Sequence, residues 1–158
     1  MARVYATQRR VEFRDTDAAG LMHFSAYFLR MEETEHEFLR SLGLSVWQAD
    51  PQHGRGDGGG KISWPRVAAQ CDYRGAVTFE QVLTIELQVL RLGAKSVTYG
   101  FTFRSADQLV AEGKVTAVCC LIRPQQPPKS LAIPDAIRTR LADYLVAPEP
   151  TAPAASAD

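Results

Sequence analysis

The chain has 158 residues, of which 46% are hydrophobic, 9% aromatic and 23% charged. A chain of this length is expected to form one domain that buries roughly 70% of the surface its unfolded form exposes, and the composition is typical of globular proteins. Because 18 basic residues balance 18 acidic ones, neither a nucleic acid nor an anionic membrane is indicated as a partner.

The sequence also bears on location and redox state. No apolar run approaches the ~20 residues that cross a bilayer, and Met1–Arg10 lacks the apolar centre of a signal peptide, so we expect a cytoplasmic protein. Cys71, Cys119 and Cys120 are odd in number and two of them are adjacent. No disulfide framework is therefore expected, and the three are interpreted as small apolar residues on strands.

The first half of the chain predicts a strand and then a helix. Side chains over residues 3–14 follow a period of two, which is typical of a strand. After an Asp-rich turn, apolar residues recur at three- and four-residue spacing, at Phe24, Phe28, Met31, Phe38 and Leu42. This spacing predicts a helix of about five turns, ended by Gly43. Its polar reverse side carries Arg30, Glu33, Glu37 and Arg40.

Two acidic residues interrupt the apolar stripe of this helix. Glu35 lies at the angular centre of the stripe and Glu32 at its edge. A buried carboxylate without a partner is energetically expensive. We therefore expect each of them to reach a subunit interface, to pair with a base or to face a wet cleft.

A loop is predicted over residues 45–60, which contain Pro51 and a glycine-rich run from 54 to 60. A glycine-rich phosphate cradle needs a strand before it and a helix after it. The residues that follow, Lys61–Pro65, have an extended pattern instead, so a phosphate-binding loop is not expected.

The second half of the chain predicts a run of strands. Apolar residues alternate over 67–73, 83–89, 97–103 and 109–121. The connections at 93–94 and 105–108 are short enough for hairpins, so the strands that they join are antiparallel.

The C-terminal part predicts a short helix and a tail. Ile133, Ile137, Leu141 and Leu145 repeat every four residues, and Pro134 suits a first helical turn. Residues 148–158 are rich in Pro and Ala and are expected to be disordered, which leaves residues 1–147 as a single domain. One strand, a long helix, four antiparallel strands and a short helix predict a two-layer α+β fold, with a five-stranded sheet covered by the long helix.

The junction between the first strand and the helix carries a motif. It reads Asp15-Thr16-Asp17-Ala18-Ala19-Gly20, and Tyr27 follows ten residues after Asp17. With the order of elements, this motif resembles the hotdog-fold acyl-CoA thioesterases of the 4-hydroxybenzoyl-CoA thioesterase family, and the resemblance extends over residues 3–123. Segments 72–73, 79–85 and 93–96 resemble later strand signatures of that family. The resemblance implies a hotdog fold, in which a five-stranded antiparallel sheet wraps around one long central helix.

The resemblance also implies a reaction. The second Asp of the motif, Asp17, would be the catalytic carboxylate, and the backbone N–H of Phe24 would hold the thioester carbonyl. Asp17 would deprotonate a water as general base or attack the carbonyl directly, and both routes stay open. An acyl-CoA would be hydrolysed to a free acid and coenzyme A, which is part of the substrate, so no separate cofactor is implied.

Further residues are implicated in substrate binding by the same resemblance. His23, Tyr27 and Glu32 would bind the substrate, and Lys95 and Ser96, in the hairpin that contains Arg91, would meet the coenzyme A phosphates. The chain departs from the family pattern at three places. Relatives often have His in place of Phe24, Asn in place of Ala26 and a basic residue in place of Glu35.

The resemblance implies assembly as well. The family forms dimers whose sheets join edge to edge, with each active site between subunits, and commonly goes on to tetramers. A homodimer, and a tetramer built from it, is therefore expected, and it would give Glu35 and the exposed sheet edge a partner.

Several residues bear on other functions. Asp17 alone would suit a helix cap or a turn, and Asp15 is interpreted as a structural residue that holds the turn. Phosphoaspartyl phosphatases also open on Asp-x-Asp, but they need a parallel sheet. The histidines lack the spacing of a metal site, and a related hydratase would need a different Asp and His arrangement. A hotdog domain that binds an acyl thioester without hydrolysing it stays open as the alternative.

Overall fold

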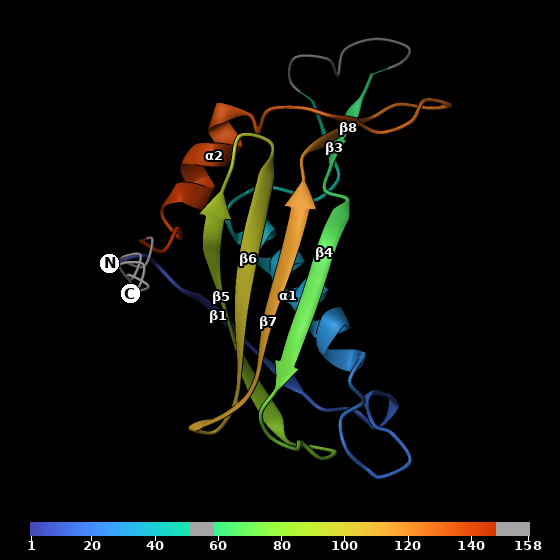
Figure 1. The fold of residues 1–158 in the computed structure, drawn as a ribbon, viewed down its shortest axis with the longest axis vertical. Coiled ribbons are helices and arrows are strands. Elements are labelled where there is room, and N and C mark those ends of the chain that lie inside the picture. The colour runs from blue at the N-terminus through green and yellow to red at the C-terminus, as the bar shows by residue number, and fades with distance from the viewer. Residues whose placement is uncertain (51–58, 148–158) are drawn as a thin grey trace, which may run out of the picture.

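The computed structural model describes residues 1–50 and 59–147, and its main element is an antiparallel sheet with a helix against one face (Figure 1). Every pair of neighbouring strands in this sheet is antiparallel. The strands follow the order β1 (Tyr5–Arg10), β5 (Val82–Leu92), β6 (Ser96–Ser105), β7 (Gln108–Val118) and β4 (Arg66–Tyr73). The predicted α+β class with antiparallel strands is confirmed.

A second, smaller sheet was not predicted. It consists of β2 (Gln48–Ala49), β3 (Lys61–Ser63), β8 (Cys120–Ile122) and β9 (Lys129–Ser130). The prediction of one strand over 109–121 is wrong at its end, because β7 stops at Val118 and β8 pairs with β3 instead. Cys119 marks the change of sheet, where its N–H donates to the Lys95 carbonyl. Apolar alternation continues through this point, so the pattern could not reveal the break.

The long helix α1 spans Ala26–Ser41 and ends as predicted. Gly43 has φ +67, the left-handed conformation that glycine adopts at low cost. The N–H of Leu44 bonds to the Leu39 carbonyl at 2.9 Å and that of Gly43 to the Arg40 carbonyl at 2.9 Å, which is a Schellman motif. The predicted start at Phe24 is two residues early, because residues 23–26 form a turn, closed by the Ala26 N–H on the His23 carbonyl.

The core lies between α1 and the inner face of the larger sheet. That face carries Leu83, Ile85, Leu87, Val89, Val97, Tyr99, Phe101 and Phe103, each at most 2% exposed. From the helix side, Met31 and Phe38 are fully buried against it. A side chain at Gly113 on β7 would overlap Met31, so a glycine there lets the helix lie close to the sheet.

The short helices lie at the ends of the sheet. The 3-10 helix η1 (Phe13–Asp15) leads into the motif, and α2 (Asp135–Ala142) is the C-terminal helix predicted from the four-residue repeat. The glycine-rich loop falls largely, and the Pro/Ala-rich tail entirely, on residues 51–58 and 148–158, which lie outside the described residues. Among the residues that the structure describes, no helix has the length and apolar character needed to span a membrane.

Candidate active site

The Asp-rich motif forms a tight loop between η1 and α1. The Oδ1 of Asp17 accepts hydrogen bonds from the N–H groups of Ala19 at 2.8 Å and Leu21 at 3.2 Å. The Asp17 N–H donates to the Leu21 carbonyl at 2.8 Å, and Gly20 takes φ +76 to close the loop. No described residue bonds to Oδ2 of this exposed carboxylate. One oxygen of Asp17 therefore fixes the loop, and the other is available to a ligand.

The next turn presents the backbone N–H of Phe24. Phe24 follows His23 at the second position of the turn that leads into α1, and no hydrogen bond joins its N–H to any described residue. Its carbonyl accepts a 2.9 Å bond from the hydroxyl of Tyr73 on β4. An unpaired N–H just before a helix is a donor for an anion or a polarised carbonyl.

Asp17 and Phe24 line the same pocket, of about 240 Å³, which we call the Asp17 pocket. Two aromatic residues, Tyr27 from α1 and Tyr73 from β4, complete its sides. Its full lining is Asp17, Leu21, Met22, Phe24, Tyr27, Tyr73, Gly75, Ala76 and Val77. Asp17 and Phe24, each with a hydrogen-bonding group that no described residue uses, thus line one partly apolar space.

Tyr27 lines this pocket from α1. It is buried, and its ring lies 5.2 Å from that of Tyr73 and 5.3 Å from that of Phe103, both edge to face. Burial raises the pKa of Tyr27 to about 12, with smaller contributions from Cys71 and Tyr73. Its hydroxyl is therefore neutral at pH 7 and can position a substrate, but it cannot act as a base.

His23 adjoins the pocket without lining it. Its Nδ1 lies 2.7 Å from the Ser25 hydroxyl, and its N–H donates to the Asp15 carbonyl at 2.7 Å. Its ring stacks near that of Phe24, with centroids 4.4 Å apart. These contacts tie His23 to the turn that presents the Phe24 N–H.

Asp15 anchors the loop to the helix, in line with the structural role predicted for it. Its Oδ2 accepts bonds from the Glu12 N–H, at 2.9 Å, and from the Arg30 guanidinium. Arg30 also pairs with Glu33 at 2.8 Å. Arg30 was placed on the polar reverse side of the helix, but it is 6% exposed, because the loop carrying Asp15 folds over that side.

Glu32 lies in a different pocket, farther along α1. This space, of about 300 Å³, is the Glu35 pocket, and its lining is Phe28, Leu29, Glu32, Glu35, Arg66, Ala69 and Val115. Arg66 bonds to Oε2 of Glu35 at 2.7 Å and lies 3.9 Å from Glu32. Pairing with a base is therefore the outcome for Glu35 among the three that the sequence left open.

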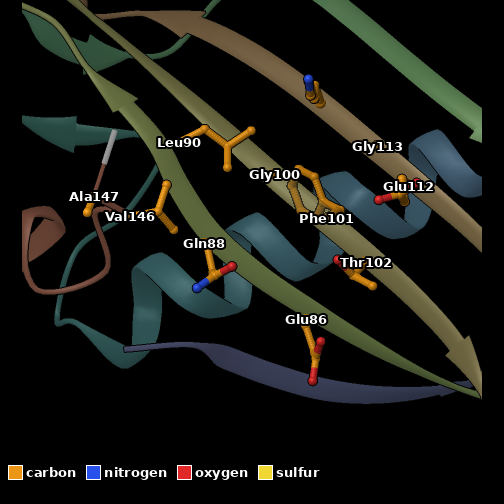
Figure 2. Close-up of a pocket in the computed structure, with 11 residues that line it drawn as sticks. Glu86, Gln88, Leu90, Gly100, Phe101, Thr102, Glu112, Gly113, Val146 and Ala147 are labelled. Carbon is orange, nitrogen blue, oxygen red and sulfur yellow. The ribbon is translucent and has the colours of Figure 1, made fainter. Parts of the chain in front are cut away.

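Lys95 and Ser96 are not part of either pocket. They lie where β5 turns into β6, at the opposite end of the sheet from the Asp17 loop (Figure 1). A further hollow of about 470 Å³ lies on the face of the sheet away from α1 (Figure 2). Its side chains include Glu86, Gln88 and Thr102, and no predicted site residue lines it. Within residues 1–50 and 59–147, no His, Cys, Asp and Glu cluster is suited to a metal ion.

Three residues that line these pockets or hold the loop beside them were missed as site residues from the sequence. The sequence pattern indicates only a strand residue at Tyr73 and a polar helix position at Arg30, and it carries no signal for Arg66. A buried acid needs a cationic partner, so Asp15 and Glu35 each signal that such a partner exists. This signal does not identify the partner residues. Arg30 is 15 positions from Asp15 in the sequence, and Arg66 is 31 positions from Glu35.

The chain is similar to known proteins over most of its length. The thioesterase-like superfamily matches residues 11–141. A 1,4-dihydroxy-2-naphthoyl-CoA hydrolase of Prochlorococcus marinus (strain MIT 9313) is 32% identical over 108 residues, which cover 68% of this chain and 72% of the relative.

Solved structures agree as well. A crystal structure from Aquifex aeolicus superposes with a TM-score of 0.71 at 25% identity, covering 87% of this chain and 98% of that one. A gentisyl-coenzyme A thioesterase superposes with a TM-score of 0.66 at 26% identity, covering 89% and 99%. The fold is therefore that of the hotdog thioesterases. The chain belongs to the thioesterase-like superfamily and is an enzyme of the thioester hydrolase class.

Proposed function

We propose that this protein hydrolyses an acyl-CoA to a free acid and coenzyme A, with Asp17 as the catalytic carboxylate and the N–H of Phe24 as the oxyanion donor. The observation that supports this most is that both residues line one pocket, each with a hydrogen-bonding group that no described residue uses. A thioester carbonyl bonded to the Phe24 N–H would gain stabilisation as its oxygen becomes negative.

Two routes lead from this arrangement to products. As general base, Oδ2 of Asp17 takes a proton from water while the water oxygen bonds to the carbonyl carbon; the C–S bond then breaks and the thiolate takes a proton. As nucleophile, Oδ2 bonds to the carbonyl carbon and displaces the thiolate, and water hydrolyses the mixed anhydride. Both routes need the same two groups.

The activity is tested with purified protein and a panel of short, long and aromatic acyl-CoAs, with the released thiol as the readout. The aromatic members should include 1,4-dihydroxy-2-naphthoyl-CoA and gentisyl-CoA, because relatives are named for them. We expect turnover of at least one ester. Saturable binding without thiol release from any ester would contradict the proposal and would favour a binding domain.

Replacing Phe24 with Pro should remove the oxyanion donor alone. Proline has no N–H, and Phe24 occupies the second position of a turn closed by Ala26 on His23, where proline is favoured. We expect kcat to fall by about 10²–10³, measured with the best ester of the panel. Phe24→Ala keeps the N–H and is the matched control, with a much smaller loss. Equal losses in the two variants would show that the ring, not the N–H, matters.

We infer that the chain forms a homodimer through β4, an edge of the larger sheet. Most of β4 is exposed, and large apolar side chains gather beside it, with Leu29 59%, Val67 63% and Tyr73 46% exposed. An unpaired edge with exposed apolar residues favours association.

If two β4 strands pair antiparallel, the β5–β6 turn of the partner subunit would come close to the end of the sheet that carries the Asp17 loop. Lys95 and Ser96 of the partner subunit would then lie on the side where the coenzyme A part of a bound substrate extends out of the pocket.

The variant Val67→Arg is expected to convert this dimer to a monomer, because it replaces apolar contact with two like charges near the shared edge. Size-exclusion chromatography with light scattering measures the mass. Val82→Arg, at an exposed valine of the interior strand β5, should leave the dimer intact. A dimer that survives Val67→Arg would place the interface elsewhere, and a mass of four chains in the unmodified protein would support the tetramer.

A further inference from the structure

The backbone of Phe24 is held only weakly by its own turn. Its side chain is 62% exposed, and the bond that closes the turn, from the Ala26 N–H to the His23 carbonyl, uses neither polar group of Phe24. Ser25, which precedes α1, makes no side-chain bond that caps the helix. The ring contact with His23 lies within the same turn. A contact from outside the turn is therefore needed to fix the direction of the Phe24 N–H.

Tyr73 supplies this contact. Its hydroxyl donates to the Phe24 carbonyl at 2.9 Å, and among the described residues this is the one hydrogen bond that a polar group of Phe24 makes. Burial and then Cys71 raise the pKa of Tyr73, so the hydroxyl keeps its proton at neutral pH and remains a donor. Only two rotatable backbone bonds separate the N–H of a residue from its carbonyl. Holding the carbonyl therefore limits the directions that the N–H can take.

The position of Tyr73 is set by the larger sheet. Tyr73 pairs with Ala111 on β7, and the N–H of the next residue, Arg74, donates to the Val110 carbonyl at 2.8 Å. The Tyr73 ring packs edge to face against the buried ring of Tyr27, with centroids 5.2 Å apart. Both the backbone and the ring of Tyr73 are thus held, which leaves its hydroxyl at a defined place beside the turn.

The segment over 73–78 also holds the loop that carries the carboxylate. Leu21 forms an antiparallel bridge with Thr78. The Leu21 N–H bonds to Oδ1 of Asp17 at 3.2 Å, and its carbonyl accepts the bond from the Asp17 N–H at 2.8 Å. One continuous segment therefore contacts the Asp17 loop and, through its first residue, the carbonyl of Phe24. It sets the two proposed catalytic groups relative to each other.

We propose that Tyr73 is a positioning residue, whose hydroxyl holds the Phe24 carbonyl so that the Phe24 N–H points to the thioester oxygen beside Asp17. This rests on the proposed acyl-CoA hydrolysis and adds to it the group that aims the oxyanion donor. Such a donor is effective when it is already aimed at the place where negative charge develops. A looser turn should therefore lower kcat more than it weakens binding of the ester.

The kinetic test is Tyr73→Phe, which removes one oxygen and keeps the ring against Tyr27. We expect kcat for the best ester of the panel to fall about tenfold, the net value of one hydrogen bond. The loss is no larger because Tyr73 is 46% exposed and water competes for the same groups. KM should change by less than about twofold. The matched control is Tyr5→Phe, whose hydroxyl lies 3.4 Å from Glu37 and outside both pockets; it should retain kcat.

A double variant shows whether Tyr73 acts through the N–H. Phe24→Pro has no N–H to aim but keeps the carbonyl that Tyr73 contacts. Adding Tyr73→Phe to Phe24→Pro should therefore cause no further loss of kcat, because residues that act as a unit are not additive. A second loss of about tenfold in this background would show that Tyr73 acts on the substrate or on the fold in general, and would overturn the inference.

An NMR measurement tests the same contact without turnover. The chain has seven Phe residues, so protein labelled with ¹⁵N-phenylalanine gives few amide signals, and Phe24→Ala identifies that of Phe24 by its absence. In Tyr73→Phe the order parameter of this N–H should fall from about 0.85 toward about 0.6, from the rigid to the flexible range. Tyr5→Phe should leave it unchanged. An unchanged order parameter in Tyr73→Phe would overturn the positioning role.

The outcomes separate this inference from the proposed activity. Hydrolysis by the unmodified protein with an unchanged kcat in Tyr73→Phe would overturn the positioning role while the activity stands. A lower order parameter in Tyr73→Phe, in a protein that hydrolyses no ester of the panel, would overturn the activity and leave the positioning role in place. Because β4 is the proposed dimer edge, light scattering also measures the mass of Tyr73→Phe. A monomer with the same kcat as Val67→Arg would assign the loss to the interface and overturn the inference.

Discussion

Asp17→Asn should lower kcat for acyl-CoA hydrolysis by at least about 10²-fold, the contribution expected of a general base. The asparagine Oδ1 can still accept the bonds from the Ala19 and Leu21 N–H groups that fix the loop. The group that replaces Oδ2 is then an amide NH₂, which can neither take a proton from water nor attack a carbonyl. The loss should therefore appear in kcat, measured by thiol release at saturating ester.

The control for this variant is Asp143→Asn. Asp143 is an exposed carboxylate beyond α2, and its ion pair with Arg3 spans 3.8 Å, which contributes little to stability. It should retain the unmodified rate. Thermal unfolding and ester binding should be unchanged in Asp17→Asn, because the loop bonds persist. Retention of the full rate by Asp17→Asn would remove this residue from the catalytic machinery.

Arg30→Met should destabilise the fold by roughly 3–5 kcal/mol, the range for removal of one partner from a buried ion pair. Arg30 and Asp15 are 6% and 7% exposed, and the substitution leaves the Asp15 carboxylate buried with only the Glu12 N–H as donor. For a chain of this size, Tm should fall on the order of 10 °C, measured by calorimetry or circular dichroism.

A double variant separates the charge effect from packing. Replacing Asp15 with Asn in the Arg30→Met background removes the uncompensated charge, so part of the lost stability should return. Arg104→Met, at a residue on the outer side of β6, should change stability by less than about 0.5 kcal/mol. An Arg30→Met protein as stable as the unmodified one would mean that the pair does not anchor the Asp17 loop.

Much of the fold could be predicted because its signals are local. The three- and four-residue apolar spacing before Gly43 identified α1, and alternating residues identified β4 to β7. Two boundaries were wrong for a physical reason. The turn over 23–26 and the change of sheet at Cys119 both depend on hydrogen bonds to other groups, and apolar periodicity continues through them.

The candidate site could be predicted only in part. Asp17, Phe24 and Tyr27 were proposed from one motif, and the structure brings them to one pocket. Glu32 lies in the neighbouring Glu35 pocket, and Lys95 and Ser96 lie at the far end of the sheet. Residues close in sequence thus stay close in space, whereas the position of a distant hairpin depends on how the strands are ordered.

The sequence by itself indicated the class of fold through its periodicity and carried the Asp-rich motif at short spacing, and the resemblance of that motif to a known family implied Asp17 as the catalytic carboxylate. The tertiary structure decided which oxygen of Asp17 is available, that the Phe24 N–H has no partner among the described residues, and that Arg30 and Arg66 pair with buried acids. It also showed that Oε1 of Glu35 and the hydroxyl of Tyr99 are buried without a hydrogen-bond partner among residues 1–50 and 59–147. Hydrogen-bond partners and burial depend on contacts between distant segments, and only the packing of α1 on the sheet brings those segments together.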